Sequence, residues 1–376
     1  MTTVVLAPDK FKGSLTAAQV AQHLATGMLR VRPDLTVRQV PMADGGEGTV
    51  AAALAAGWTE RTATVTGPLG DPVQCAYALS PDGAACVVEM SLASGLALTR
   101  ADVDAARRSS SIGTGELIGH ALDDGARRIL LGVGGSASTD GGAGLVQALG
   151  VRLLAADGSD LPGGGAALTA ISAVDLSGLD PRLGETEVVL AADVDNPLLG
   201  ASGAAAVYGP QKGADDATVA ELEAGLARWV EALAEVRPEA ARAADAPGAG
   251  AAGGVGYAAL ALLGATRRSG IEVVIELTGL ADQLLGADLA VTGEGSLDEQ
   301  SLYGKTPVGV ARAAAAAGVP TVAVAGRSLL SDDELVAHGI AACYPLSALE
   351  PDPQTSMREA GRLLEDLAAQ IVAAHL

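Results

Sequence analysis

The chain has 376 residues, of which 49% are hydrophobic, and a formal net charge of −21. This length exceeds what one hydrophobic core usually supports, so two domains are expected. The negative charge repels nucleic-acid backbones and anionic lipid, so we predict neither nucleic acid nor a membrane as a partner. The apolar runs are too short to cross a bilayer, the first residues lack a basic n-region and the three cysteines lie far apart. We therefore expect a cytoplasmic protein without disulfides or zinc.

Short apolar strands and helices alternate near both ends of the chain. The N-terminal elements are expected at 4–9, 14–30, 37–44 and 47–56, with Ser14 as the N-cap of the first helix. The C-terminal elements are expected at 287–295, 308–317, 320–327, 331–338, 341–347 and 354–375. This alternation is typical of βαβ units in a parallel sheet.

The middle of the chain has a different pattern. Residues 61–90 predict successive antiparallel strands, joined by Gly-Pro and Pro-Asp-Gly turns. Further elements are expected as helices at 115–124, 142–149 and 215–236 and as strands at 127–135 and 187–194. The Ala/Gly-rich stretch 237–256 is either a linker or a loop that leads into a helix, and we favour the loop.

The two patterns predict a discontinuous domain and an inserted one. The first would comprise 1–68 and 281–376, and 69–280 would form an inserted α/β domain. Ligand sites often form between domains, so we expect the active site in the cleft between these two.

A glycine-rich loop, LGVGGSASTDGGAG at 131–144, follows an apolar strand and precedes a helix. Glycines allow backbone N–H groups to approach phosphate oxygens, and a helix N-terminus favours negative charge. We therefore predict ATP phosphates here, on Gly134, Gly135, Ser136, Ser138, Asp140 and Gly141. A tight turn with close packing is the alternative, and Asp140 would either cap the helix or face Mg²⁺.

Carboxylates follow three other apolar strands. Candidate Mg²⁺ ligands are Asp44, Glu47, Glu294 and Asp298, because Mg²⁺ prefers a few carboxylates with waters and substrate phosphates. Asp44 and Glu47 could instead form an ordinary helix cap. Asp193, in the stretch ADVDNPLLG, is a candidate general base for a hydroxyl, and Asp44 is nearly as plausible.

The four lysines of the chain all lie in glycine- or proline-punctuated loops. Lys10, Lys12 and Lys212 are candidates to bind an anionic substrate, together with Ser14 and Asn196. Lys305 is assigned a catalytic role as a phosphate or carboxylate clamp, because its ammonium is a mobile point charge. Surface salt bridges are the alternative for any single lysine.

The residue types missing from these loops narrow the chemistry. The four histidines lie in predicted helices, and no G-x-S-x-G elbow occurs. Carboxylates, lysines and backbone amides remain, and this set suits phosphoryl transfer, in which positioning and charge stabilisation contribute most. An NAD-dependent dehydrogenase would need a dinucleotide fingerprint in the first βα unit, and APDKFKGS lacks one.

Taken together, the motifs resemble the bacterial glycerate kinase type-1 family. The resemblance covers nearly the whole chain, through APDKFKGSLTA, PMADGGEGTV, GVGGSASTDGGAG, DVDNPLLG, GPQKGA, PGAGAAGGVG and VTGEGSLDEQSLYGKTPVGVA. It implies a Rossmann/flavodoxin-like parallel-sheet domain built from both chain ends, with an inserted mixed α/β domain. It also implies ATP-dependent phosphorylation of D-glycerate, an organic acid. Mg²⁺ is the metal that we expect from the carboxylates of the loops.

The resemblance assigns no residue roles by itself. We favour 2-phosphoglycerate as the product, and 3-phosphoglycerate is the alternative. A non-catalytic protein that binds nucleotides or sugar acids on the same scaffold also remains open. The sequence does not determine the oligomeric state, so a homodimer remains open as well.

Overall fold

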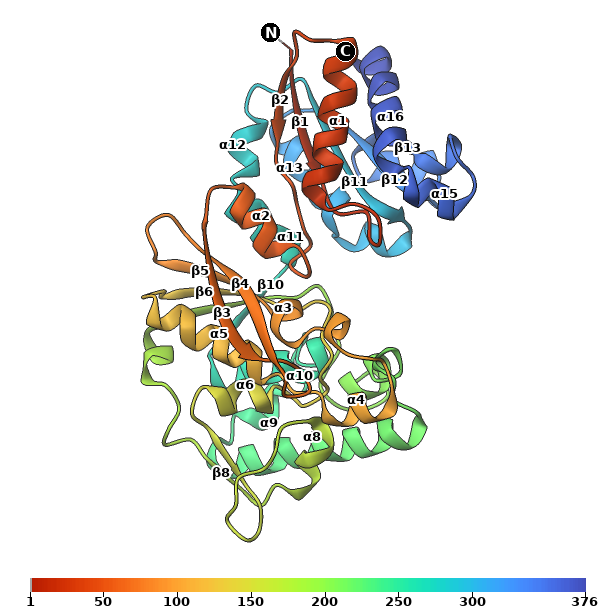
Figure 1. Ribbon diagram of the computed structural model, residues 1–376. Helices are drawn as coiled ribbons and strands as arrows, with labels where there is room; N and C mark the ends of the chain where they lie inside the picture. Colours follow the sequence, from red (N-terminus) through yellow and green to blue (C-terminus); the bar gives the residue numbers. More distant parts are fainter. Residues whose placement is uncertain (1) are drawn as a thin grey trace. The chain divides into compact units, whose positions relative to one another are not determined.

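The computed structural model describes residues 2–376, apart from the side chain of Tyr303, and the chain divides into two compact units (Figure 1). Unit 1 consists of Met1–Asp44, Ala51–Gly57 and Ser269–Leu376, and unit 2 of Gly45–Val50 and Trp58–Arg268. The sequence placed the boundaries near 68 and 281. They lie earlier because strand β3 (Thr59–Thr66) pairs with β4 (Pro72–Leu79) in unit 2, whereas helix α11 (Gly270–Thr278) packs in unit 1.

Unit 1 contains a five-stranded sheet in which every neighbouring pair is parallel, in the order β13-β12-β11-β1-β2. The strands are β1 (Thr3–Pro8), β2 (Thr36–Gln39), β11 (Leu289–Leu297), β12 (Thr321–Ser328) and β13 (Ile340–Pro345). Numbered along the chain and read from the β2 edge, the order is 2-1-3-4-5, which is the flavodoxin-like arrangement. Its switch point lies between β1 and β11, where ligands bind in such folds.

Helices cover both faces of this sheet (Figure 1). Val4 and Leu6 of β1 pack with α1 (Ala17–Val31) and α16 (Ala360–His375). Val5 and Ala7, which point to the other face because strand side chains alternate, pack with helices α11, α12 (Leu280–Leu284) and α13 (Thr306–Ala316). The other helices of unit 1 are α2 (Thr49–Ala55, which starts in unit 2), α14 (Asp332–Ala337) and α15 (Pro353–Arg358).

Helix α1 begins later than the sequence predicted. Its N-cap is Thr16, whose hydroxyl accepts from the Gln19 N–H while the Gln19 side chain accepts from the Thr16 N–H. Ser14 cannot cap this helix because it lies in a turn in which its N–H donates to the Phe11 carbonyl. The Ser14 hydroxyl donates instead to the Met357 carbonyl over 2.7 Å. Ser14 therefore ties the turn to helix α15.

Unit 2 contains a six-stranded mixed sheet in the order β10-β9-β6-β5-β4-β3. Strands β3, β4 and β5 (Ala85–Glu89) are antiparallel, which confirms the prediction for 61–90. The pairs β5–β6, β6–β9 and β9–β10 are parallel. The bounds of the last three strands are β6 Arg128–Gly132, β9 Glu187–Ala191 and β10 Thr266–Arg268. A small antiparallel pair, β7 (Arg152–Leu154) and β8 (Ala173–Asp175), was not predicted.

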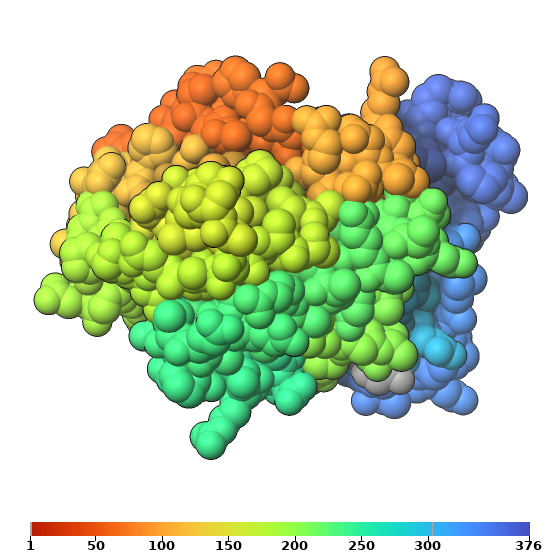
Figure 2. Space-filling view, turned by 90° about the horizontal axis from the view of Figure 1, so that it is seen from below, coloured from red at the N-terminus to blue at the C-terminus, as the bar shows by residue number. Residues whose placement is uncertain are grey.

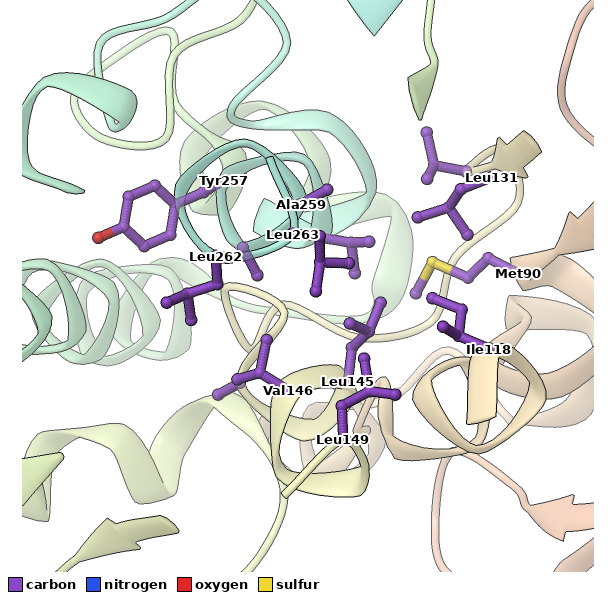
Figure 3. Packing of buried hydrophobic residues seen from close by; sticks show 14 of the residues in the cluster. Met90, Ile118, Leu131, Leu145, Val146, Leu149, Tyr257, Ala259, Leu262 and Leu263 are labelled. Atoms are coloured by element: carbon purple, nitrogen blue, oxygen red, sulfur yellow. The ribbon is translucent and has the colours of Figure 1, made fainter. Parts of the chain in front are cut away.

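One large apolar core holds unit 2 together. Figure 3 shows part of it, with Met90, Ile118, Leu131, Leu145, Val146, Leu149, Tyr257, Ala259, Leu262 and Leu263 packed together. The helices of this unit are α3 (Met90–Ser94), α4 (Val103–Arg108), α5 (Ile112–Asp123), α6 (Ala143–Ala148), α7 (Ala204–Tyr208), α8 (Asp216–Val236), α9 (Ala240–Ala243) and α10 (Ala251–Leu262). Trp229 of α8 meets Tyr257 of α10 edge to face, with ring centroids 6.3 Å apart.

The surface of unit 2 is covered in part by its longest helix. Figure 2 shows residues of α8, in green, adjoining the yellow-green segment that contains η2 (Gly165–Ala170). The contact is close, because a Cβ at Gly225 would lie 2.7 Å from the Gly165 carbonyl oxygen. Among the described residues, no helix is long and apolar enough to cross a membrane.

The Ala/Gly-rich stretch after α8 leads into a helix, as the favoured interpretation predicted. Helix α10 contains three successive residues with left-handed backbone angles, Ala252, Gly253 and Gly254, with φ of 54°, 67° and 95°. Left-handed angles are costly for residues with a Cβ, so Ala252 is held by its surroundings. This kink lies beside the glycine-rich loop at the end of β6, as described below.

Candidate active site

In unit 1, polar side chains gather where the pairing of β1 with β11 ends, at the switch point of the sheet. Asp9 directly follows β1, and its N–H donates to the Gly293 carbonyl of β11 over 2.8 Å. Glu294 is the next residue of β11. Asp44 lies two residues beyond Met42, whose N–H donates to the Pro8 carbonyl. Three carboxylates from separate parts of the chain therefore lie at one edge of the sheet.

Asp9 is the most enclosed of these carboxylates, with 5% of the residue exposed. Oδ1 accepts from the Lys10 N–H at 2.6 Å and lies 3.6 Å from Lys10 Nζ, and Oδ2 accepts from the Thr306 hydroxyl at 2.9 Å. Burial raises the pKa of Asp9 to about 6, although the charge of Lys10 opposes the rise, and the neighbouring charge of Asp44 adds to it. The sequence reasoning missed Asp9, although its position directly after β1 was a signal.

Glu294 also has an unusual environment. Its Oε1 is buried and has no hydrogen-bond partner among the described residues. Burial raises the pKa of Glu294 to about 7, opposed by a hydrogen bond from Ser301 and by the charge of Lys305, and supported by the charges of Asp9 and Asp44. Perturbed carboxylates that influence one another are common at functional sites.

The predicted residues near this group have different surroundings. Lys305 is the N-cap residue of α13 and acts electrostatically on Glu294. Lys12 is exposed, and its backbone lies near Gly295. Asp298 is the N-cap of the short helix η5 (Glu299–Tyr303), where Oδ1 accepts from the Gln300 N–H at 2.9 Å. Asp298 thus has a structural role as a helix cap.

In unit 2, the loop of residues 45–50 is anchored by Glu89, at the end of β5. Glu89 is 2% exposed, and its two oxygens accept from the N–H groups of Gly48 and Val50, each at 3.1 Å. This carboxylate satisfies free N–H groups at the start of α2, so the cap comes from Glu89. Sequence reasoning missed it because the two segments are about 40 residues apart.

The loop carrying Glu47 lies against the glycine-rich loop. A Cβ at Gly132 would be 2.6 Å from the Gly45 carbonyl oxygen, and one at Gly134 would be 2.7 Å from Gly46 Cα. Only glycine permits this approach of two backbones. Glu47 therefore lies in a loop that packs directly on the predicted phosphate-binding loop of the same unit.

Asp140 lies inside the glycine-rich loop and is completely buried. Its Oδ2 accepts from the N–H and hydroxyl of Ser111, each at 2.8 Å, and from the Gly144 N–H at 3.2 Å. Its Oδ1 accepts from the Gly142 N–H at 3.1 Å. Of the two roles considered for Asp140, these contacts support capping and loop stabilisation. Both carboxylate oxygens are therefore engaged within the protein interior.

Lys212 also lies beneath this loop. It is 2% exposed, and its Nζ donates to the Ser136 hydroxyl at 2.9 Å and to the Ser138 carbonyl at 2.5 Å. Burial lowers the pKa of Lys212 to about 7, opposed by the charge of Asp140. Lys212 was predicted to bind an anionic substrate from a glycine- and proline-punctuated loop, whereas its side chain is enclosed.

The kink in α10 supports the glycine-rich loop from another direction. The Gly141 N–H donates to the Gly253 carbonyl at 2.9 Å, and a Cβ on Gly253 would collide with the Ser138 carbonyl oxygen. The Trp229 indole N–H donates to the Gly141 carbonyl at 3.1 Å. Elements from three parts of unit 2 thus fix the conformation of one loop.

The loop after β9 carries the remaining predicted residues. Asp193 is exposed, and its neighbour Asp195 pairs with Arg267 at 2.7 Å. The side chain of Asn196 is engaged by its own loop and by helix α7, since Nδ2 donates to the Ser202 carbonyl and Oδ1 accepts from the Tyr208 hydroxyl. Asn196 therefore stabilises the loop in which Asp193 lies.

The predicted metal ligands are not gathered into one ready-made site. Among the described residues, no three or more His, Cys, Asp or Glu side chains are placed to hold a metal ion by themselves. Glu47 belongs to unit 2, whereas Asp44, Glu294 and Asp298 belong to unit 1. The carboxylates of unit 1, with the buried orphan oxygen of Glu294, still suit an ion that completes its shell with waters and phosphates.

Comparisons with known proteins extend these observations. Residues 4–376 match the model of the glycerate kinase family. The chain is 44% identical over 372 residues to a glycerate kinase of Halalkalibacterium halodurans, covering 99% of this chain and 97% of the relative. It is 46% identical over 336 residues to a glycerate 2-kinase of Escherichia coli K12, covering 89% and 87%.

A solved structure agrees with the fold. The crystal structure of a protein described as glycerate kinase 2 from Salmonella typhimurium LT2 superposes with a TM-score of 0.83 at 41% identity, covering 99% of this chain and 98% of that one. Fold, polar sites and relatives together define an α/β phosphotransferase with an alcohol group as acceptor. The chain belongs to the glycerate kinase family. The resemblance inferred from the motifs and the expected α/β fold class are therefore confirmed.

Proposed function

We propose that this protein is an ATP-dependent glycerate kinase that transfers the γ-phosphate of ATP to D-glycerate. The observation that carries the proposal is the group of Asp9, Asp44 and Glu294 with Lys10 and Lys305 at the switch point of unit 1. It combines cations for an organic acid with carboxylates for a metal ion, in a chain whose relatives bear the name glycerate kinase.

The lysines of unit 1 would neutralise the substrate. Lys10, Lys12 and Lys305 come from the loop after β1 and from the start of α13. Without them, the carboxylates nearby would repel the glycerate carboxylate. Ser14 and Asn196 remain proposed contacts, although both side chains already have partners within the protein.

Mg²⁺ fits the carboxylates of unit 1. We propose that Asp44 and Glu294 hold it, and that Asp298 contributes directly or through water. Glu47, which the sequence also proposed as a ligand, belongs to unit 2. When bound, the ion neutralises charge on the transferring phosphate. The glycine-rich loop of unit 2, at Gly134, Gly135, Ser136, Ser138 and Gly141, would hold the ATP phosphates through backbone N–H groups and hydroxyls.

Transfer needs a proton acceptor for the substrate hydroxyl. Asp193 is proposed as this base because it is exposed at the end of β9, and Asp44 is the alternative. The hydroxyl oxygen forms a bond to the γ-phosphorus, the bond from that phosphorus to the ADP oxygen breaks, and the hydroxyl proton passes to the carboxylate.

We favour the 2-hydroxyl as acceptor, because the E. coli relative is named a glycerate 2-kinase at 46% identity. A cytoplasmic location also remains our proposal. The test is ADP release from purified protein with MgATP and D-glycerate, followed by ³¹P NMR of the product. A 2-phosphomonoester is expected. A 3-phosphomonoester would reverse the regiochemistry, and binding of ATP without turnover of any short hydroxy acid would favour a non-catalytic protein.

A further inference from the structure

Lys212 differs from the other lysines of the chain in its surroundings. Lys10 keeps 23% of its side chain exposed and Lys12 is exposed, whereas Lys212 is enclosed with 2% exposure. The turn that carries Lys212 is closely packed. Gly213, with φ of 100°, closes the turn against Ala101 and Asp102 so tightly that a Cβ there would collide with their backbone.

Among the described residues, the buried ammonium donates hydrogen bonds to one loop. Its two hydrogen bonds, to the Ser136 hydroxyl and to the Ser138 carbonyl, both end in the glycine-rich loop. A lysine that binds substrate as a mobile point charge would keep its ammonium accessible. Lys212 instead acts as an internal support that joins η4 (Pro210–Lys212) to the loop.

The same loop holds hydroxyls that lack partners. Ser138 is 0% exposed and Thr139 is 1% exposed, and neither Oγ of Ser138 nor Oγ1 of Thr139 has a hydrogen-bond partner in the described part of the chain. Leaving a buried hydroxyl unpaired is costly, so such groups call for an explanation. A phosphate oxygen would accept from them only after a shift of the loop exposes them, because both hydroxyls are enclosed.

We propose that Lys212 is a positioning residue for the nucleotide phosphates, holding Ser136 and Ser138 of the glycine-rich loop in the conformation that binds them. This inference rests on the proposed kinase function and deepens it. It also removes Lys212 from the group of lysines that contact glycerate.

The charges around Lys212 give the proposal a measurable consequence. Asp140, from the same loop, is the carboxylate that acts on it and favours its charged form. The carboxylates of Asp102 and Asp215 are engaged as the N-caps of α4 and α8. Burial outweighs Asp140 and lowers the pKa of Lys212 to about 7, so at pH 8 the free protein holds it mostly neutral.

Phosphates bound at the loop would reverse this balance. Their negative charge favours the ammonium form, so binding of MgATP at pH 8 should be accompanied by uptake of a proton at Lys212. The nucleotide phosphates are already deprotonated at this pH and release few protons of their own. A purely structural lysine would produce no such uptake.

The experiment is calorimetric titration of MgATP, without glycerate, into wild-type protein at pH 8 in buffers of different ionisation enthalpy. Wild type should take up a fraction of a proton approaching one per site. Lys212→Met, which keeps the buried length and removes the donors, should take up none and bind about tenfold or more weakly. Ser136→Ala should weaken binding less and retain the uptake. Arg242→Met, at an exposed position of α9, serves as the matched control and should behave as wild type.

The outcomes separate this inference from the proposed function. If wild type turns over glycerate but shows no proton uptake, or if Lys212→Met matches it in affinity and uptake, the inference is overturned and the function stands. If Lys212→Met raises only the KM for glycerate, the inference is also overturned. Wild type that binds no MgATP would overturn both. If Lys212→Met does not fold, proton uptake by wild type and by Ser136→Ala still tests the inference, and no uptake by either protein overturns it.

Discussion

The Thr306 hydroxyl donates to Oδ2 of Asp9 over 2.9 Å and joins residues 297 positions apart in the sequence. It links the first residue of α13 to the end of β1. Because Asp9 is buried beside Glu294 and Asp44, this bond helps to keep a carboxylate in a place where its charge is costly. Stability given up at such a position is common at functional sites.

Asp9 should destabilise the fold as pH rises. Its pKa is raised from 3.8 to about 6 on folding, so the folded state binds the proton more tightly, and the free energy of unfolding falls as pH rises through this window. Above this pH window, the ionised Asp9 carboxylate lowers the free energy of unfolding by about 3 kcal/mol. We expect the stability of Asp9→Asn relative to wild type to rise between pH 4 and pH 7, measured by urea unfolding.

The control for Asp9 is Asp34→Asn. Hydrogen bonding to Arg32 lowers the pKa of the exposed Asp34, so the stability of this variant relative to wild type should fall or stay flat with rising pH. A flat profile for Asp9→Asn would show that the Asp9 carboxyl is not perturbed.

Asp193 should affect turnover rather than binding. If it accepts the hydroxyl proton, Asp193→Asn should lower kcat by about 10²-fold or more, with both KM values nearly unchanged. Asp195→Asn is the matched control, since Asp195 lies two residues away and is paired with Arg267. Full activity of Asp193→Asn would move the role of base to Asp44, and steady-state kinetics of Asp44→Asn would then be decisive.

Gly253 should be intolerant of a side chain for two reasons. Its φ of +67° is strained for alanine, and a Cβ would collide with the Ser138 carbonyl of the glycine-rich loop. Gly264, with φ of +63° and nothing within 4 Å, carries only the first penalty. Gly264→Ala should cost about 1 kcal/mol in unfolding free energy, and Gly253→Ala should cost more and weaken MgATP binding. Equal effects on both measurements would contradict the close packing.

Asp140 should contribute to the stability of the fold and not to direct contact with the nucleotide. Asp140→Asn places an amide among donors from Ser111, Gly142 and Gly144, so we expect a loss of about 3 kcal/mol or more in unfolding free energy. Asp160→Asn, which breaks an exposed pair with Arg152, should cost much less, because exposed ion pairs contribute little to stability. Denaturant titration compares them. Loss of MgATP affinity at unchanged stability would instead place Asp140 in contact with the nucleotide.

Much of the candidate site was visible in the sequence because its signals are local. Gly134, Ser136 and Asp44 follow apolar strands, and both strand periodicity and glycine spacing can be read within a few residues. The contacts of Glu89 with residues 48–50 could not be predicted this way, since they join the end of β5 to the start of α2, far apart in sequence.

The sequence by itself determined the α/β alternation, the antiparallel strands of the middle segment and the loops in which carboxylates and lysines lie. These features depend on side-chain periodicity and on turn-forming residues, which act over short distances. Only the tertiary structure decided that β11 pairs with β1, so that Glu294 lies at the same sheet edge as Asp9, and that Lys212 is enclosed beneath a loop some 70 residues earlier in the chain. Strand order and burial arise from long-range packing, and no local pattern specifies them.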